Sequence, residues 1–178
     1  MTEQQEASED AVMTRIGQAV ILLHAGDREE ARNRLGEIWS EIGEDGDSLH
    51  RCTLAHYMAD AQDDPAEELA WDLRALTAAA PAASAPGEGI PGVRTAGRAG
   101  QRAMRVFYPS LHLSLAADYV KLRRPEAARV HLARARAATG ALSDDGYGNG
   151  VRAAIARLER SLAADPGERP RPFPEQSP

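Results

Sequence analysis

A segment of twelve residues occurs twice in this chain, 62 positions apart, and it constrains the fold more than any other feature. It runs from Leu49 to Asp60 as LHRCTLAHYMAD and from Leu111 to Leu122 as LHLSLAADYVKL, so that Leu, His, Ala and Tyr coincide. Each copy is followed within a few residues by an X-Pro pair and a second alanine-rich segment. A segment that recurs together with its neighbour is typical of proteins that stack one supersecondary unit several times.

The apolar residues of the chain favour helices over strands. Hydrophobic residues make up 43% of the sequence but aromatic residues only 4%, so the core has to be built largely from Ala, Leu, Ile and Val. No stretch alternates polar and apolar residues for long enough to predict a strand. The sequence therefore predicts an all-α protein, and its 178 residues suffice for one domain with a proper core.

Charge and composition argue against several kinds of partner. The formal net charge is −6, whereas nonspecific nucleic-acid binding depends on a basic surface that neutralises phosphates. No apolar run approaches the roughly 20 residues of a membrane-spanning helix, and the acidic start does not resemble a signal peptide. We therefore expect a cytoplasmic protein with no nucleic-acid or membrane partner. All basic residues except Lys121 are arginine, a bias typical of GC-rich bacterial coding.

Apolar spacing predicts seven helices, arranged as three antiparallel pairs and a single closing helix. Their starts are marked by Asp27, by Asp64-Pro65 and by Arg124-Pro125, because aspartate caps a helix and proline suits its first turn. The stripes expected to be buried are Ala31, Leu35, Ile38, Trp39 and Ile42 in the second helix, Ala66, Leu69, Leu73 and Leu76 in the fourth, Ala128, Leu132 and Ala135 in the sixth, and Val151, Ile155, Leu158 and Leu162 in the seventh.

Proline and glycine divide the chain into a helical domain and less regular segments. Residues 10–163 are predicted to form the domain, after an acidic flexible N-terminus at residues 1–9. Residues 81–103 are rich in proline and glycine and are interpreted as a flexible insertion, after which Pro109 opens the third pair. Residues 164–178 contain five prolines and are predicted to be a disordered tail.

Two of the predicted pairs share a spacing of small and large residues. The third pair shows it at Leu115, Ala116, Tyr119, Ala128, Leu132 and Ala135, and the first pair at Ala19, Leu22, Gly26, Ala31, Leu35 and Ile38. This pattern resembles that of the tetratricopeptide repeat family, whose unit is a helix–turn–helix of about 34 residues. The second pair departs from it, because Asp63-Asp64-Pro65 lengthens the turn. The resemblance covers about residues 10–163 and implies a right-handed α-solenoid of three helix pairs closed by a C-terminal capping helix.

The resemblance also implies a binding surface. In this family the first helix of each pair lines a concave groove that holds a peptide or a helix of a partner protein. Its floor here would be apolar, with three polar points that suit a peptide carrying a carboxylate. We therefore expect a non-catalytic adaptor or scaffold for a protein partner, with self-association as a further hypothesis. The implied groove residues are Ile16, Val20, Leu23, His24, Arg51, Ala55, Met58, Leu113, Val120 and Lys121.

A set of polar residues in the repeated segments supports an alternative function. His56 and Asp118 occupy matching positions of the two copies, each next to a tyrosine, and this arrangement indicates a polar cluster between repeats. Such a cluster would suit a small-molecule- or metal-binding regulator, or an enzyme without a recognised signature. The members of this set are His50, His56, Tyr57, Asp60, His112, Asp118 and Tyr119.

A metal site is one specific version of this alternative. Cys52, His56 and Asp60 are spaced by four residues along one helix face, and thiolate, imidazole and carboxylate all bind transition metals. Residues eight apart lie about 12 Å apart along a helix, so at most two of them could share an ion with His112. We favour a buried Cys52, a His56–Asp60 pair on the helix surface, and half-buried side chains with satisfied hydrogen bonds for His50 and His112. No catalytic residue, metal or cofactor is expected.

Overall fold

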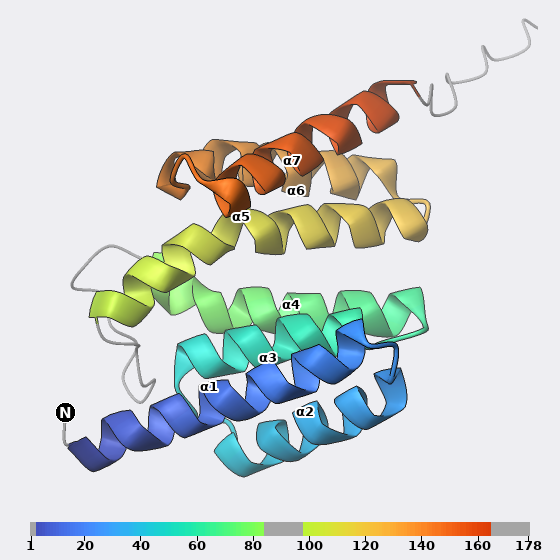
Figure 1. The fold of residues 1–178 in the computed structure, drawn as a ribbon. Coiled ribbons are helices and arrows are strands. Elements are labelled where there is room, and N and C mark those ends of the chain that lie inside the picture. Colours follow the sequence, from blue (N-terminus) through green and yellow to red (C-terminus); the bar gives the residue numbers. More distant parts are fainter. Residues whose placement is uncertain (1–2, 84–97, 165–178) are drawn as a thin grey trace, which may run out of the picture.

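The structure of the protein is a computed structural model that describes residues 3–83 and 98–164 (Figure 1). These residues form seven α-helices and one short 3-10 helix, with no strand among them, which confirms the predicted all-α class. No helix in this part of the chain is long and apolar enough to cross a membrane. The elements are α1 (Glu3–His24), α2 (Arg28–Ile42), α3 (Ser48–Asp60), α4 (Pro65–Ala83), α5 (Arg98–Lys121), α6 (Pro125–Ala137), the 3-10 helix η1 (Ala138–Ala141) and α7 (Gly146–Ala164).

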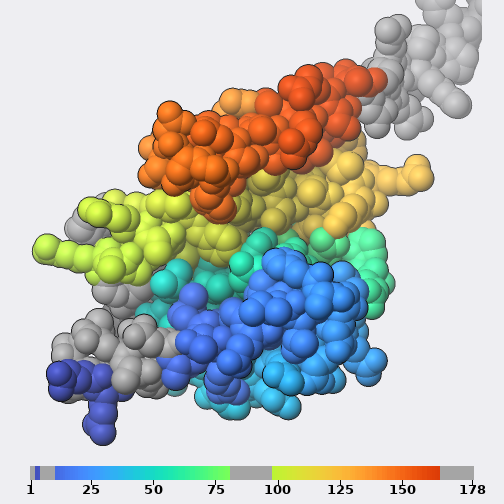
Figure 2. Space-filling model, in the orientation of Figure 1, coloured from blue at the N-terminus to red at the C-terminus, as the bar shows by residue number. Residues whose placement is uncertain are grey.

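The helices pack in the order in which they follow one another in the sequence. Each α-helix contacts the next, and further contacts join α1 to α3, α3 to α5, and α5 to α7. Figure 1 shows consecutive helices lying side by side from the blue α1–α2 end to the orange α7 end. The space-filling view in Figure 2 shows the same order of colours across the molecule. The interior is therefore distributed along the row of helices.

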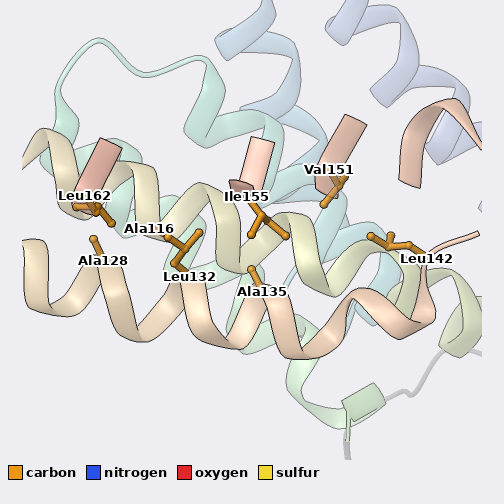
Figure 3. Close-up of a cluster of buried hydrophobic side chains, with 8 residues drawn as sticks. All are labelled: Ala116, Ala128, Leu132, Ala135, Leu142, Val151, Ile155 and Leu162. Carbon is orange, nitrogen blue, oxygen red and sulfur yellow. The ribbon is translucent and has the colours of Figure 1, made fainter. Parts of the chain in front are cut away.

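Three clusters of buried apolar side chains follow this order along the molecule. The first lies between α1, α2 and α3, the second between α3, α4 and α5, and the third between α5, α6 and α7 with the turn before α7. They comprise Ile16, Ala19, Leu35, Ile38, Leu54 and Met58; Cys52, Ala55, Ala75, Ala79, Met104 and Leu111; and, as drawn in Figure 3, Ala116, Ala128, Leu132, Ala135, Leu142, Val151, Ile155 and Leu162.

The predicted stripes of α2, α6 and α7 are confirmed. Their central residues are buried, and Trp39, Ile42 and Leu158 pack against the clusters from partly buried positions. Alanine is frequent in these contacts because its small side chain lets two helix backbones approach closely. The alanines without any exposed surface include Ala19, Ala31, Ala55, Ala59, Ala75, Ala79, Ala116, Ala128 and Ala135.

The predicted helix starts are also confirmed. The Asp27 carboxylate accepts a hydrogen bond from the Glu30 backbone N–H at 3.3 Å, and Gly26 ends the preceding turn at a φ of +92° that favours glycine. The Asp64 carboxylate accepts one from the Ala66 N–H at 2.7 Å. Pro125 is the first residue of α6. These local interactions determine where each helix begins.

Pro109 does not open a helix, contrary to the prediction. Helix α5 begins at Arg98 and continues through Pro109, which is buried. A proline inside a helix removes one hydrogen bond and conflicts with the preceding turn, and Figure 1 shows a bend in α5. The helix persists because Met104 before the proline and Leu111 after it both belong to the second core cluster.

The irregular segments are shorter than predicted. Helix α1 already begins at Glu3, within the segment 1–9 that we expected to be flexible. Helix α4 continues to Ala83 and α5 starts at Arg98, so helix covers both ends of the predicted insertion 81–103. Residues 1–2, 84–97 and 165–178, which include most of the predicted tail, lie outside the part of the chain that the structure describes.

The predicted buried face of α4 is wrong. Ala66 is exposed and Leu73 is 38% exposed, whereas Asp72 is only 2% exposed and lies on the buried side with Ala75 and Ala79. The leucine stripe and this alanine face both have helical spacing, so periodicity alone did not distinguish them. The observed buried face of α4 matters for function, because it places the Asp72 carboxyl group inside the molecule.

Candidate functional site

An open hollow with a volume of about 810 Å³ lies where α3, α5 and α7 meet. Helix α5 supplies most of its wall, α3 supplies one tyrosine, and the first turn of α7 supplies another. Its surface is largely apolar and aromatic, with two arginines from the first turns of α5. The residues that line it are Tyr57, Arg98, Ala99, Arg102, Ala103, Val106, Phe107 and Tyr147.

The two arginines give the hollow its charge. Arg98 and Arg102 are four residues apart, so their side chains project from the same face of α5. Within the described residues, neither arginine forms an ion pair or a hydrogen bond with an acidic side chain. An arginine without a carboxylate partner can bind one from another molecule, often through two parallel hydrogen bonds. The hollow therefore combines an apolar surface with two available cations.

Local contacts hold the aromatic side chains of the hollow in place. Tyr147 is 48% exposed, and its hydroxyl forms a hydrogen bond with the Ser110 hydroxyl of α5. The Phe107 ring meets the His56 ring edge to face, with 5.1 Å between ring centroids. Burial raises the pKa of Tyr57, and the charge of Asp60 raises it further, so its hydroxyl stays protonated at neutral pH. The hollow thus has a preformed aromatic wall.

From His56, whose ring contacts Phe107, a series of interacting polar side chains extends into the interior. His56 Nδ1 lies 3.2 Å from Asp72 Oδ1, and His56 Nε2 lies 4.0 Å from Asp60 Oδ2. A carboxylate can only accept a hydrogen bond, so the imidazole donates from Nδ1 to Asp72. Burial lowers the pKa of His56, but the hydrogen bond and charge of Asp72, together with Asp60, outweigh burial and raise it overall. The predicted His56–Asp60 pair is present, and Asp72 is the closer partner.

Asp118 of α5 is the next residue in this series of polar side chains. Burial raises the pKa of its carboxyl group to about 8, and the neighbouring charges of Asp72 and Glu68, together with hydrogen bonding to Asp72, add to the effect. Lys121 Nζ lies 3.9 Å from Asp118 Oδ1 and 2.5 Å from Glu68 Oε1. Asp118 Oδ2 is buried and has no hydrogen-bond partner among the described residues.

A second polar group joins α5 to α6. The Nδ1 atoms of His112 and His131 are 2.9 Å apart, so one ring donates a hydrogen bond and the other accepts it. The His131 ring stacks on Tyr119, and the Tyr108 ring meets His112 edge to face. Burial lowers the pKa of His112 to about 4, so its imidazole is neutral at pH 7. We expected a half-buried histidine with its hydrogen bonds satisfied, whereas His112 is fully buried and its Nε2 atom has no hydrogen-bond partner among the described residues.

The structure divides the predicted polar set into separate groups. His56, Asp60 and Asp118 belong to the series of polar side chains around Asp72, with Tyr57 beside Asp60. His112 and Tyr119 belong to the group around His131, and His50 is buried near the start of α3.

Cys52 is buried as predicted, and burial followed by the charge of Asp72 raises its pKa to about 12. No three His, Cys, Asp or Glu residues in the described ranges are arranged to hold a metal ion.

Several predicted groove residues are not accessible. Ile16, Ala55 and Met58 are buried in the core, so they cannot line an open surface. Tyr57, one position before Met58, faces the hollow instead, because a helix turns by about 100° per residue. The rest lie at the surface: Val20, Leu23, Arg51 and Leu113 are partly buried, and His24, Val120 and Lys121 are exposed.

Sequence reasoning missed the residues that complete both polar groups and the hollow. An aspartate such as Asp72, between Trp71 and Leu73, is predicted to be a surface residue unless its partners are known, and these partners come from other helices. One signal was available for Asp72, since Ala75 and Ala79 follow it at helical spacing on an alanine-rich face. The missed residues are Asp72, Arg98, Arg102, Phe107, His131 and Tyr147.

No protein-family model matches the sequence, and comparisons with curated proteins and with solved structures gave no match either. The resemblance to the tetratricopeptide repeat family therefore stays a prediction from the sequence.

Proposed function

We propose that the chain is a non-catalytic interaction module that holds an acidic segment of a partner protein in the hollow between α3, α5 and α7. The proposal includes a right-handed, tetratricopeptide-like solenoid of three helix pairs with α7 as the capping helix. The contacts between consecutive helices and between α1, α3, α5 and α7 support that arrangement, because stacked helix pairs make such contacts. Stacked pairs also present extended surfaces on which these proteins bind their partners.

An aromatic wall next to two arginines that have no acidic partner within the described residues carries this proposal. Arg98 and Arg102 make the hollow locally positive, although the formal net charge of the protein is −6. A carboxylate of the partner would bind the arginines, and a neighbouring apolar side chain would pack on Phe107 and Tyr147. Pockets for small ligands measure about 300–1,000 Å³, so a hollow of about 810 Å³ has room for a few side chains.

Site-specific photo-cross-linking in cells tests the proposal directly. A photoreactive amino acid replaces Ala103, which lines the hollow, and a matched variant carries it at Ala133, an exposed position on α6. The Ala103 variant should cross-link one dominant partner at a segment that contains both acidic and large apolar residues. Labelling that is equal at the two positions would contradict the proposal.

Charge reversal then tests the arginines with a synthetic peptide of the cross-linked segment. The double variant Arg98→Glu/Arg102→Glu should weaken binding at least tenfold, and binding by the unaltered chain should weaken as salt increases. Arg157→Glu makes the same type of charge change on the exposed face of α7 and should leave affinity unchanged. The apolar part is tested by Phe107→Ala, with Val130→Ala at a 51% exposed position on α6 as its control. Affinity that is indifferent to both hollow variants would overturn the proposal.

A small molecule is the alternative occupant. The same pairing of two arginines with an aromatic wall would suit an amphipathic carboxylate, and the volume of the hollow falls within the usual range for such sites. Dodecanoate serves as the probe. A rise in melting temperature with dodecanoate that the double arginine variant abolishes, together with no cross-linked protein, would favour a ligand-binding regulator.

A further inference from the structure

Two carboxyl groups face each other in the interior where α4 packs against α5. Asp72 is 2% exposed and Asp118 is 1% exposed, and the charge of Asp72 acts on the Asp118 carboxyl group. Two ionised carboxylates buried this deeply would repel each other, and a proton on one of them removes that repulsion. The buried Oδ2 atom of Asp118 has no hydrogen-bond partner in the described part of the chain, so a negative charge on this carboxyl group would lack a donor there to stabilise it.

The charged groups around the pair do not neutralise two carboxylates. From α3 come His56, which donates to Asp72, and Asp60 on the far side of His56. From α4 comes Glu68, and from α5 comes Lys121, which already pairs with Glu68 at 2.5 Å. Lys121 is also 3.9 Å from Asp118 and about half exposed, so it offers Asp118 little compensation.

The thiol of Cys52 on α3, on which the charge of Asp72 acts, is neutral at physiological pH, because burial and that charge raise its pKa to about 12. No residue of α6 or α7 in the described ranges contributes a charge that acts on Asp118. With both aspartates ionised, four carboxylates would face one lysine and one histidine.

We propose that Asp72 and Asp118 form a proton-binding site, which holds one proton between them at neutral pH and makes the packing of α4 against α5 sensitive to pH. The inference goes beyond binding in the hollow and does not depend on it. Its physical basis is that two adjacent carboxyl groups in a site of low polarity cannot both ionise without strong repulsion. The proton therefore acts as a structural ligand of the junction between α3, α4 and α5.

The direction of the pH effect follows from the difference between the pKa of Asp118 in the folded chain and its pKa in the unfolded chain. Its pKa is about 8 in the folded chain, whereas an unfolded aspartate titrates near about 3.9. Between these values the folded chain binds about one more proton than the unfolded chain, so this group makes the folded state less favourable as pH rises. The expected change is about tenfold in the ratio of folded to unfolded molecules per pH unit, ending near the folded pKa. His56 acts in the same direction, since its raised pKa stabilises the fold at low pH and loses that effect as pH rises.

Two measurements on the full chain test the proposal. In ¹³C NMR of aspartate carboxyl carbons, one side chain should titrate near pH 8 in the native protein, and this titration should be absent in Asp118→Asn. In urea unfolding at a series of pH values, Asp118→Asn should raise the unfolding midpoint at pH 8 and leave it nearly unchanged at pH 4. The variant keeps the shape of the protonated carboxyl group, and its amide N–H can donate a hydrogen bond as a protonated carboxyl group can.

Asp45→Asn is the control, since it makes the same chemical change at an exposed turn, and it should reproduce the pH profile of the unaltered chain. Two results would overturn the proposal: no aspartate carboxyl that titrates above pH 6, or an Asp118→Asn profile parallel to that of the unaltered chain. The NMR titration requires no variant, so it decides the question even if the substitution disturbs folding.

Discussion

Trp39 of α2 and Trp71 of α4 meet edge to face, with their ring centroids 5.2 Å apart and their planes at 84°. The two helices are not consecutive, since α3 lies between them in the sequence. Both indoles pack against the first and the second core clusters, so the pair joins these two parts of the interior. Each ring also carries an arginine guanidinium, Arg51 over Trp39 at 4.4 Å and Arg74 over Trp71 at 4.3 Å.

We expect the tryptophan pair to stabilise the fold cooperatively. Trp71→Ala should lower the free energy of unfolding by about 3 kcal/mol, because it removes a large side chain between two core clusters. A double-mutant cycle with Trp39→Ala should give a coupling energy of about 1 kcal/mol, the usual size for an aromatic pair. Arg74→Ala removes only an exposed cation and should cost less than about 1 kcal/mol. Urea unfolding followed by circular dichroism provides these values; strictly additive effects would show that the ring contact contributes nothing of its own.

Gly148 and Gly150 form a matched pair of glycines near the start of α7. A Cβ atom at Gly148 would lie 2.1 Å from the backbone oxygen of Ser143, whereas one at Gly150 would meet no atom within 4 Å. Gly148→Ala should therefore destabilise the protein by about 2 kcal/mol through overpacking. Gly150→Ala should stabilise it by roughly 0.5–1 kcal/mol, because alanine loses less backbone entropy in a helix. Thermal unfolding of both variants checks the prediction, which fails if the two shifts have the same sign.

Cys52 should be unreactive in the folded protein. Its thiol is buried and its pKa is raised to about 12, so at pH 8 almost no thiolate is present to react. Modification by a disulfide reagent should then require global opening and should accelerate with urea in parallel with unfolding. Ser40→Cys in a Cys52→Ser background places a thiol at an exposed position of α2 and should react at least about 1,000-fold faster. Rapid native labelling of Cys52 would contradict the burial of this position.

His112 should make the protein sensitive to acid. Its pKa is lowered to about 4 in the folded chain, against about 6.5 when unfolded, so the unfolded chain binds the extra proton between these values. The stabilisation that neutral His112 contributes is therefore complete above pH 6.5. As pH falls towards 4, the free energy of unfolding decreases by about 1 kcal/mol per pH unit. His112→Leu should remove this dependence, whereas His24→Leu at an exposed position should not. Urea unfolding between pH 4 and 7 measures the difference, and unchanged slopes in both variants would refute the prediction. The effect has the opposite sign to that of Asp118.

Features that depend on neighbouring residues alone were predictable from the sequence. Asp27 and Asp64 cap helices because their carboxylates reach backbone N–H groups two or three residues ahead, an interaction that needs no other part of the fold. The buried stripes of α2, α6 and α7 were predicted for a related reason, since each is the one apolar face that its helix possesses. The repeated segment likewise indicated a protein in which helices of similar pattern recur.

Features that depend on partners from distant helices were decided by the tertiary structure. Asp72 is buried because His56 of α3 and Asp118 of α5 surround it, and neither residue is near it in the sequence. Pro109 lies inside a helix because the burial of Met104 and Leu111 outweighs the local cost of a proline. The hollow exists because Tyr57, Phe107 and Tyr147, from three helices, come together. The sequence thus determined the helices and their ends through short-range hydrogen bonds and spacing, whereas packing between helices decided which face turned inward and which polar groups met.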